Sequence, residues 1–283
     1  MLKIPVLFNE KMVCSSGCVS SPSAHKPAEV MQEWRKLFPN SIEEILSVPV
    51  SVSDLSLAHD EHYVRNVLNG LTENGFGNTS AAVAESLPFT SGAMLGAARQ
   101  ALANGKVAVA PVSGFHHACH AFGGGFCTFN GLMVTAMSLL TEDKNVARVG
   151  ILDLDQHYGN GTDDIIRTLG LSENTLRHYT AGGKRNQAES FLQELPTLMA
   201  TVFEGCDILL YQAGADPHIK DPLGGWMTNE QLAERDSIVF RTAKNMNMPV
   251  AWDLAGGYQT PLQKVLDIHN NTMQACISTY LEQ

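Results

Sequence analysis

The feature that most constrains the fold is an alternation of short apolar runs with longer amphipathic segments. Each run is β-branched or mostly apolar and ends in a glycine-rich or polar turn, as expected of strands that are buried on both faces. Four such runs occupy residues 107–112, 149–154, 208–211 and 249–254. Strands that alternate with helices predict an α/β fold, a parallel β-sheet with helices on both of its faces.

Helical patterns fill the spaces between these runs. They are predicted over residues 90–104, with Gly105 as the stop, over 131–140 and 229–246, and from Thr260 as N-cap with Pro261 in the first turn. No linker or internal repeat interrupts the pattern, so we expect a single domain over residues 1–283. Residues 14–30 and 75–92 are rich in Ser, Gly and Asn, and we expect irregular loops there that shape an entrance.

Composition excludes some classes of function. The chain has 29 acidic and 19 basic residues and a formal net charge of -10, which argues against nucleic acid as a partner because phosphate binding needs clustered Lys and Arg. No run is long enough to span a membrane, and Pro5 breaks the first apolar stretch, so no signal peptide is expected. Six cysteines in a chain of this size predict free thiols and a cytoplasmic protein.

Polar clusters follow the four predicted strands directly. They lie at residues 113–117, 153–161, 213–218 and 255–258. In open parallel sheets, ligands bind outside the carboxyl ends of the strands, so these clusters are expected to converge on one crevice.

Three residues of these clusters suit a metal ion. Asp155 and His157 are one residue apart and point the same way in an extended segment, and Asp216 at another strand end is well placed as a third ligand. One imidazole and two carboxylates suit Zn²⁺, with a position left for water or substrate. A short motif alone would favour a strand-end turn with a solvated ion pair. The other three clusters favour the metal.

The remaining polar residues suit amide hydrolysis. His116 and His117 could share the tasks of base and acid, with Asp153 and Asn160 as acceptors that fix their tautomers. Since Asn160 cannot carry a negative charge, the histidine that it orients should be the less basic. Tyr258 could donate to a developing oxyanion. The plainer interpretations are two surface histidines and a buried aromatic residue.

With these motifs in this order, the chain closely resembles the histone deacetylase superfamily, which includes bacterial deacylases and acetylpolyamine amidohydrolases. The resemblance runs from about His59 to Gln259. Three segments look most like its class IV branch: Gly123-Gly124-Gly125-Phe126-Cys127, Asp221-Pro222-Leu223-Gly224-Gly225 and Gly256-Gly257-Tyr258-Gln259.

The resemblance implies an arginase-like fold and a role for each motif residue. Asp155, His157 and Asp216 match the zinc ligands. The other matches are His117 as general base and acid, His116 as its electrostatic partner, Asp153 and Asn160 as the residues that orient the pair, Tyr258 as the residue that polarises the acyl carbonyl, and Gly125, Phe126 and Leu223 as substrate-binding residues. A structural K⁺ beneath the zinc, held through Asp153 and the backbone near Asp155 and His157, is also implied.

Two segments depart from the family pattern. Ala255 replaces a glycine, which we expect to be tolerated, and residues 176–183 lack the aromatic residue that usually forms the second wall of the substrate tunnel. The sequence therefore predicts a zinc-dependent enzyme that removes an acetyl or longer fatty acyl group from a lysine side chain of a protein or peptide. The alternatives are an acetylpolyamine amidohydrolase, acting on a small acylated amine, and a non-catalytic protein that binds acyl ligands.

Overall fold

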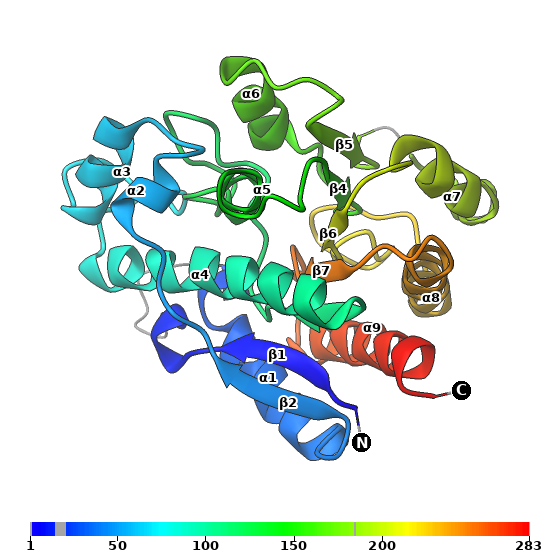
Figure 1. The fold of residues 1–283 in the computed structure, drawn as a ribbon. Coiled ribbons are helices and arrows are strands. Elements are labelled where there is room, and N and C mark those ends of the chain that lie inside the picture. Colours follow the sequence, from blue (N-terminus) through cyan, green and yellow to red (C-terminus); the bar gives the residue numbers. More distant parts are fainter. Residues whose placement is uncertain (1, 15–20, 184, 283) are drawn as a thin grey trace.

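The computed structural model describes residues 2–14, 21–183 and 185–282. Its centre is a parallel sheet of seven strands in the order β2-β1-β3-β7-β6-β4-β5 (Figure 1). The strands are β1 (Ile4–Phe8), β2 (Ile42–Leu46), β3 (Val107–Val109), β4 (Val149–Asp153), β5 (Leu176–Thr180), β6 (Ile208–Gln212) and β7 (Val250–Asp253). The predicted α/β fold with a parallel sheet is confirmed.

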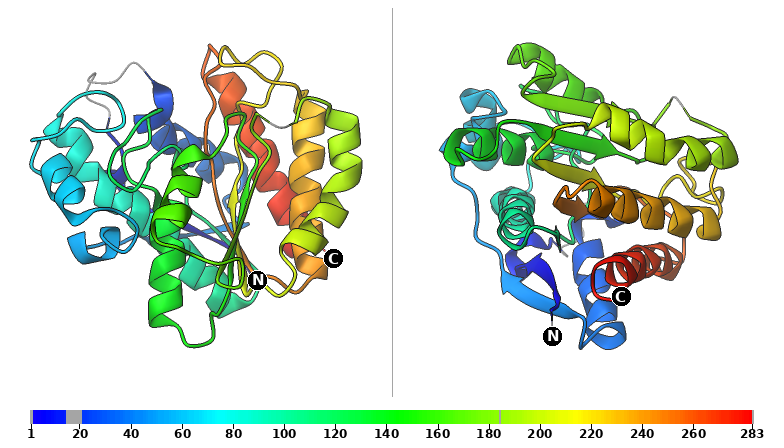
Figure 2. Two further views of the ribbon diagram at one scale, coloured as in Figure 1. Left: turned by 90° about the horizontal axis from the view of Figure 1, so that it is seen from above. Right: turned by 45° about the vertical axis from the view of Figure 1, so that its right-hand side comes forward.

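Helices cover both faces of this sheet (Figure 2). On one face α1 packs on α9, α9 on α8 and α8 on α7, whereas α4, α5 and α6 cover the other. The helices are α1 (Lys26–Leu37), α2 (Val52–Leu55), α3 (Glu61–Leu68), α4 (Ala81–Asn104), α5 (Gly131–Glu142), α6 (Asn160–Thr168), α7 (Ala188–Val202), α8 (Asn229–Asn245) and α9 (Gln263–Tyr280), with short 3-10 turns η1 (Glu10–Met12) and η2 (Pro22–Ala24).

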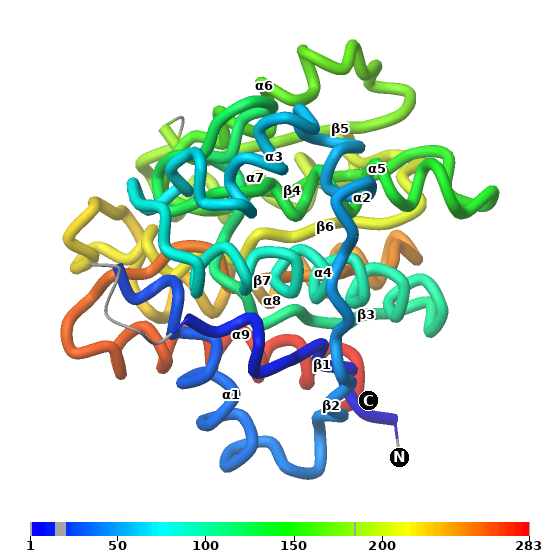
Figure 3. The backbone as a smooth tube through the Cα atoms, turned by 90° about the vertical axis from the view of Figure 1, so that its left-hand side faces the viewer, coloured from blue at the N-terminus to red at the C-terminus, as the bar shows by residue number. Residues whose placement is uncertain are grey.

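The prediction of an irregular loop over residues 75–92 is wrong from Ala81 onward, because α4 begins there. Ser80 caps the helix by accepting a hydrogen bond from the amide of Val83. The segment was predicted as a loop because it is rich in Ser, Gly and Asn, but it continues as a helix past Pro88, which lies inside it. The segment that follows β2 crosses α4 here (Figure 3), and the amide of Val50 donates to the carbonyl of Pro88.

Other predicted bounds need smaller corrections. In the predicted loop 14–30, η2 and the start of α1 lie within the described residues, whereas residues 15–20 lie outside them. The last helix starts at Gln263 with Leu262 as its N-cap, so Thr260 and Pro261 lie before the helix and the predicted cap is wrong. The helix predicted over residues 229–246 is confirmed as α8, with Thr228 and Gln231 forming a capping box. Among the described helices, none has the length and apolarity needed to cross a bilayer.

The strand order creates a crevice at the carboxyl end of the sheet. β3 and β4 follow one another in the chain but are separated in the sheet by β7 and β6. Where neighbouring strands send their connections in opposite directions, a gap remains between those connections at the carboxyl end of the sheet. The four polar clusters follow β3, β7, β6 and β4, which are adjacent strands, so the topology brings all four to one place.

Candidate active site

Asp155, His157 and Asp216 form a compact group of possible metal ligands. One atom of each lies within 4.8 Å of the corresponding atoms of the other two. The Nδ1 atom of His157 is 3.1 Å from Asp155 Oδ1 and 3.0 Å from Asp216 Oδ2. Because a single proton on Nδ1 can point at only one carboxylate, a cation at the common centre would satisfy all three side chains better.

The backbone around these carboxylates is shaped for them. The amide of Gly256 donates to Asp155 Oδ2 at 3.0 Å, and the amide of Gln156 donates to Asp216 Oδ1 at 3.2 Å. A β-carbon on Gly256 would lie 2.5 Å from Asp216 Oδ2, so only glycine leaves room for the carboxylate there. Asp216 Oδ2 is buried, and the donor beside it, His157 Nδ1, is shared with Asp155, so this oxygen remains available to a cation. The donor set and its packing fit zinc.

Burying two carboxylates side by side lowers the stability of the folded protein unless a cation neutralises them. Burial and the charge of Asp155 raise the pKa of Asp216 to about 7. Burial acts in the same direction on Asp155, but the charge of His116 and the hydrogen bond from His157 outweigh it and hold the pKa of Asp155 below its usual range. Hydrogen bonds to Asp155 and Asp216 raise the pKa of His157 to about 10, so a metal ion would displace a proton from this imidazole.

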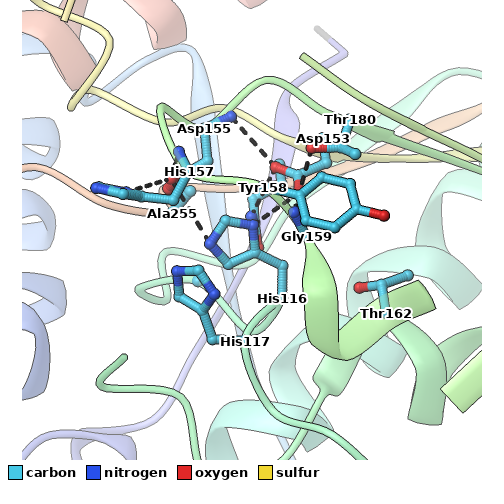
Figure 4. Close-up of polar contacts among 12 residues, drawn as sticks. His116, His117, Asp153, Asp155, His157, Tyr158, Gly159, Thr162, Thr180 and Ala255 are labelled. Atoms are coloured by element: carbon cyan, nitrogen blue, oxygen red, sulfur yellow. Dashed lines mark hydrogen bonds and ion pairs between the residues drawn. The ribbon is translucent and has the colours of Figure 1, made fainter. Parts of the chain in front are cut away.

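His116 and His117 lie beside Asp155 and His157 (Figure 4). His116 is buried and its Nδ1 lies 2.7 Å from Asp153 Oδ2, whereas the Nδ1 of His117 lies 2.6 Å from Asn160 Oδ1. The two rings are 4.1 Å apart between centroids. The sequence offered Asp153 and Asn160 as acceptors, and the structure assigns one to each imidazole.

The partners give the two imidazoles different charges. Burial lowers the pKa of His116, but the charges of Asp153 and Asp155 outweigh it and raise that pKa to about 9. Burial and the neighbouring charge of His116 lower the pKa of His117. At neutral pH, His116 is therefore the cation and His117 is neutral and able to accept a proton.

Tyr258 and the Gly125-Phe126 turn complete the pocket. The ring of Tyr258 lies 5.7 Å from that of Phe126, and its backbone amide donates to Asp221 Oδ2. Burial raises the pKa of Tyr258, so its hydroxyl stays protonated and can donate. A β-carbon on Gly125 would lie 2.5 Å from Cδ2 of His117, so glycine lets this turn close against the imidazole.

Two predicted features lie away from the pocket. Leu223 is 47 % exposed on the turn after Asp221 and does not line the pocket, so its contact with substrate stays a prediction. Among the described residues that line the pocket, none comes from residues 176–183, which form β5 and the turn after it.

Three residues of the site were not identified from the sequence. Gln212, buried at the end of β6, donates to Asp153 Oδ1 and accepts from the amide of Phe115. Lys26 is fully buried and donates to the carbonyl of Ala255 at 2.6 Å, and Ser23 bonds the Tyr258 hydroxyl. A glutamine that directly follows an apolar strand was a usable signal for Gln212. Lys26 and Ser23 lie far away in sequence and gave none.

Comparison with known proteins finds similarity to histone deacetylases and acetylpolyamine amidohydrolases. A family model described as the histone deacetylase domain matches residues 23–178, which include the histidine pair and residues 153–160. Similar proteins include an uncharacterized protein of Picosynechococcus sp. (28% identical, covering 80% of this chain and 82% of that protein), histone deacetylase 2 of Arabidopsis thaliana (27%, 59% and 48%) and the acetylpolyamine amidohydrolase of Mycoplana ramosa (28%, 52% and 50%). The chain thus matches only about half the length of the latter two.

The fold has a counterpart among solved structures. The crystal structure of the HDA15 HD domain superposes with a TM-score of 0.78, covering 98% of this chain and 89% of that one at 17% sequence identity. At this identity the likeness establishes the arrangement of strands and helices alone.

Proposed function

Because the chain belongs to the histone deacetylase family, we propose that it is a zinc-dependent amidohydrolase that removes an acyl group from the side-chain amine of lysine. One arrangement carries the proposal: His116, His117 and Tyr258 line one small pocket together with Asp155, which belongs to the group of three possible metal ligands. The pKa shifts make His116 the charged imidazole, leave His117 neutral and keep the hydroxyl of Tyr258 protonated. Hydrolysis of an unactivated amide needs all of these, namely an electrophile, a base that becomes an acid, and an oxyanion donor.

The chain's own residues have distinct tasks in this reaction. When bound by Asp155, His157 and Asp216, zinc supplies a Lewis acid for water and the acyl carbonyl. His117, neutral and oriented by Asn160, accepts the proton of the attacking water and then passes it to the leaving amine. The hydroxyl of Tyr258 donates to the oxyanion, and the positive charge of His116 favours the negative charge that develops nearby.

A second candidate, hydrolysis of acetylated polyamines, is favoured by one specific observation. The chain carries a formal net charge of -10, which would attract a polycation, and two similar proteins are named acetylpolyamine amidohydrolases. A non-catalytic acyl-ligand binder is disfavoured because such a protein would not need Tyr258 or a neutral His117. A structural K⁺ near Asp153, a class IV-like, bacterial-type identity and a cytoplasmic location stay predictions.

Hydrolysis assays test the proposal directly. The zinc-loaded protein would be given lysine peptides carrying acetyl, hexanoyl or tetradecanoyl groups and, separately, acetylspermidine, with the Asp216→Asn variant as the blank. Cleavage of a peptide by the wild type and none by the blank is expected. Preference for acetylspermidine would select the polyamine substrate instead. Full zinc occupancy with no cleavage of any substrate would overturn the enzyme proposal.

A further inference from the structure

Arg235 is a buried arginine that has no task in the proposed reaction. It belongs to α8, one of the helices that cover the sheet (Figure 2), and its side chain is fully buried. Removing a guanidinium from water lowers stability unless its donors are well paired. The partners of Arg235 therefore indicate why a charged side chain occupies this position.

Nη1 of Arg235 joins the two segments that carry the carboxylate ligands. Its two protons go to the carbonyl of Leu154 at 3.0 Å and to the carbonyl of Gly214 at 2.8 Å. Leu154 directly precedes Asp155, and Gly214 lies two residues before Asp216. Both carbonyls lie just beyond the ends of β4 and β6, and among the described residues no backbone amide donates to either. Arg235 thus bridges the two segments where the hydrogen bonds of the sheet have ended.

The two ligand segments pack against each other at Gly214. A β-carbon on Gly214 would lie 2.7 Å from Asp216 Oδ1 and 2.8 Å from the Cα atom of Asp155. A movement of Gly214 would therefore shift the two carboxylates relative to each other. Since the carbonyl of Gly214 is bonded to Arg235, this arginine limits that movement.

The guanidinium is itself held in place by Asp236. Nε of Arg235 donates to Asp236 Oδ1 at 2.8 Å, and the same carboxylate accepts from Tyr211 at 2.5 Å and from Thr272 Oγ1 at 2.6 Å. Burial acts to lower the pKa of Arg235, but the charge of Asp236 outweighs burial, so the pKa is raised and the guanidinium is charged. A planar guanidinium presents all these donors in one fixed geometry, which the ammonium of lysine cannot do.

Resting on the proposed function, in which these carboxylates hold zinc, we propose that Arg235 is a positioning residue for the metal group. Its hydrogen bonds to the carbonyls of Leu154 and Gly214 hold Asp155 and Asp216 in the arrangement that binds the ion. Groups that orient metal ligands typically contribute about 10- to 100-fold to metal affinity. Loss of Arg235 therefore weakens zinc binding itself, in addition to any effect on the stability of the fold.

The test measures the dissociation constant of Zn²⁺ by competition with a chelator. Arg235→Met keeps an unbranched side chain without its donors, and it should raise this Kd by about 10- to 100-fold. The visible absorption of Co²⁺ bound in place of zinc should change as well, because it depends on the geometry of the ligands. Arg235→Lys keeps the positive charge but not the two bonds from Nη1, so it should also weaken zinc binding.

Two control variants separate positioning from stability. Asp236→Asn removes the negative charge beside Arg235 but can still accept a hydrogen bond from Nε, so it should lower the free energy of unfolding and leave the Kd for zinc unchanged. Arg241→Met makes the same substitution at an exposed position of the same helix and should change neither quantity. Urea unfolding in EDTA measures the stability of each metal-free variant.

The outcomes distinguish this proposal from the proposed function. If the wild type does not bind zinc, the proposed function is wrong and the role of Arg235 is wrong with it. If the wild type binds zinc and folded Arg235→Met binds it equally well, only the role of Arg235 is wrong. That role is also wrong if Arg235→Lys has the affinity of the wild type, or if Asp236→Asn weakens zinc binding as much as Arg235→Met does. Should Arg235→Met fail to fold, Arg235→Lys decides the question.

Discussion

The imidazole of His59 and the group formed by Asp155 and Asp216 are both buried and polar, but they differ in how completely their atoms are paired. The Nδ1 of His59 bonds the carbonyl of Cys119 at 2.9 Å, and its Nε2 accepts from the amide of Asn130 at 2.8 Å. Asp216, by contrast, is buried next to a second carboxylate, and the donor beside its Oδ2, His157 Nδ1, is shared with that carboxylate.

The completeness of hydrogen bonding distinguishes buried polar groups that stabilise the fold from buried polar groups that bind a ligand. Complete pairing offsets the cost of removing an imidazole from water, so His59 ties residues 119 and 130 together. Incomplete pairing leaves Asp216 at a cost in stability, which is the usual condition of a binding site. Variants of the two regions should therefore respond in opposite ways.

The largest effect is expected from Asp216→Asn, a change that preserves shape and removes charge. Zinc content and hydrolysis should both fall to background, since a ligand is lost. The metal-free protein should become more stable by on the order of 1–2 kcal/mol, because two carboxylates no longer share a buried site. Mass spectrometry for zinc and urea unfolding in EDTA measure the two effects, with Glu43→Gln on the exposed face of β2 as control. If the metal-free Asp216→Asn protein were instead destabilised like an ordinary core variant, the proposed contrast between Asp216 and His59 would be wrong.

Tyr258→Phe should keep the metal and lose the reaction. Removing one oxyanion donor lowers kcat by about a hundred- to a thousandfold, whereas the remaining ring still packs beside Phe126. Steady-state kinetics on a zinc-loaded sample would show the loss, and zinc content should match the wild type. Unchanged turnover would remove Tyr258 from the mechanism.

The lowered pKa of His59 predicts that the free energy of unfolding depends on pH. Burial lowers its pKa from 6.5 to about 4, so between these values the unfolded chain binds a proton that the folded chain does not. The stability due to neutral His59 is complete above pH 6.5 and is lost as the pH falls towards 4, by roughly 3 kcal/mol. His59→Leu should lose about 2–4 kcal/mol at pH 7 by leaving two backbone groups unpaired, and should depend less on pH. Urea unfolding at several pH values measures both curves. If the free energies of unfolding of the wild type and of His59→Leu changed with pH in parallel, the pH dependence would not come from His59.

How far the sequence could predict this molecule depends on the kind of signal. The runs that became β3, β4, β6 and β7 were identifiable because both faces of those strands are buried. β2 is largely exposed and carries two glutamates, and β5 has a mixed pattern, so apolarity did not reveal them. The start of α4 was missed for a different reason, because residues 75–92 are rich in Ser, Gly and Asn and were taken for a loop.

The candidate site shows the same division. Residues that directly follow a strand were predictable, since parallel topology brings strand ends together whatever the loops do. Lys26 was not, because its place beneath Ala255 depends on how α1 docks on the sheet. The cavity lined by Val83, Leu87, Phe115 and Phe129 was also beyond prediction. It exists because η2, α4 and two loops leave a space between them, and no local pattern encodes a space.

The smallest expected effect concerns Ala255, the residue before Gly256 and Gly257. Ala255 has a φ of 50°, in the left-handed region that costs a residue with a β-carbon about 1–2 kcal/mol. Ala255→Gly relieves that strain but loses a buried methyl group and adds freedom to the unfolded chain, so its net effect should be close to zero. Ala251→Gly, in the equally buried β7, has no strain to relieve and should cost about 1 kcal/mol more. Urea unfolding of both variants measures the difference. If both variants lose the same free energy of unfolding, the left-handed conformation of Ala255 does not lower the stability of the fold. The unfavourable free energy in this site would then come from its buried carboxylates alone.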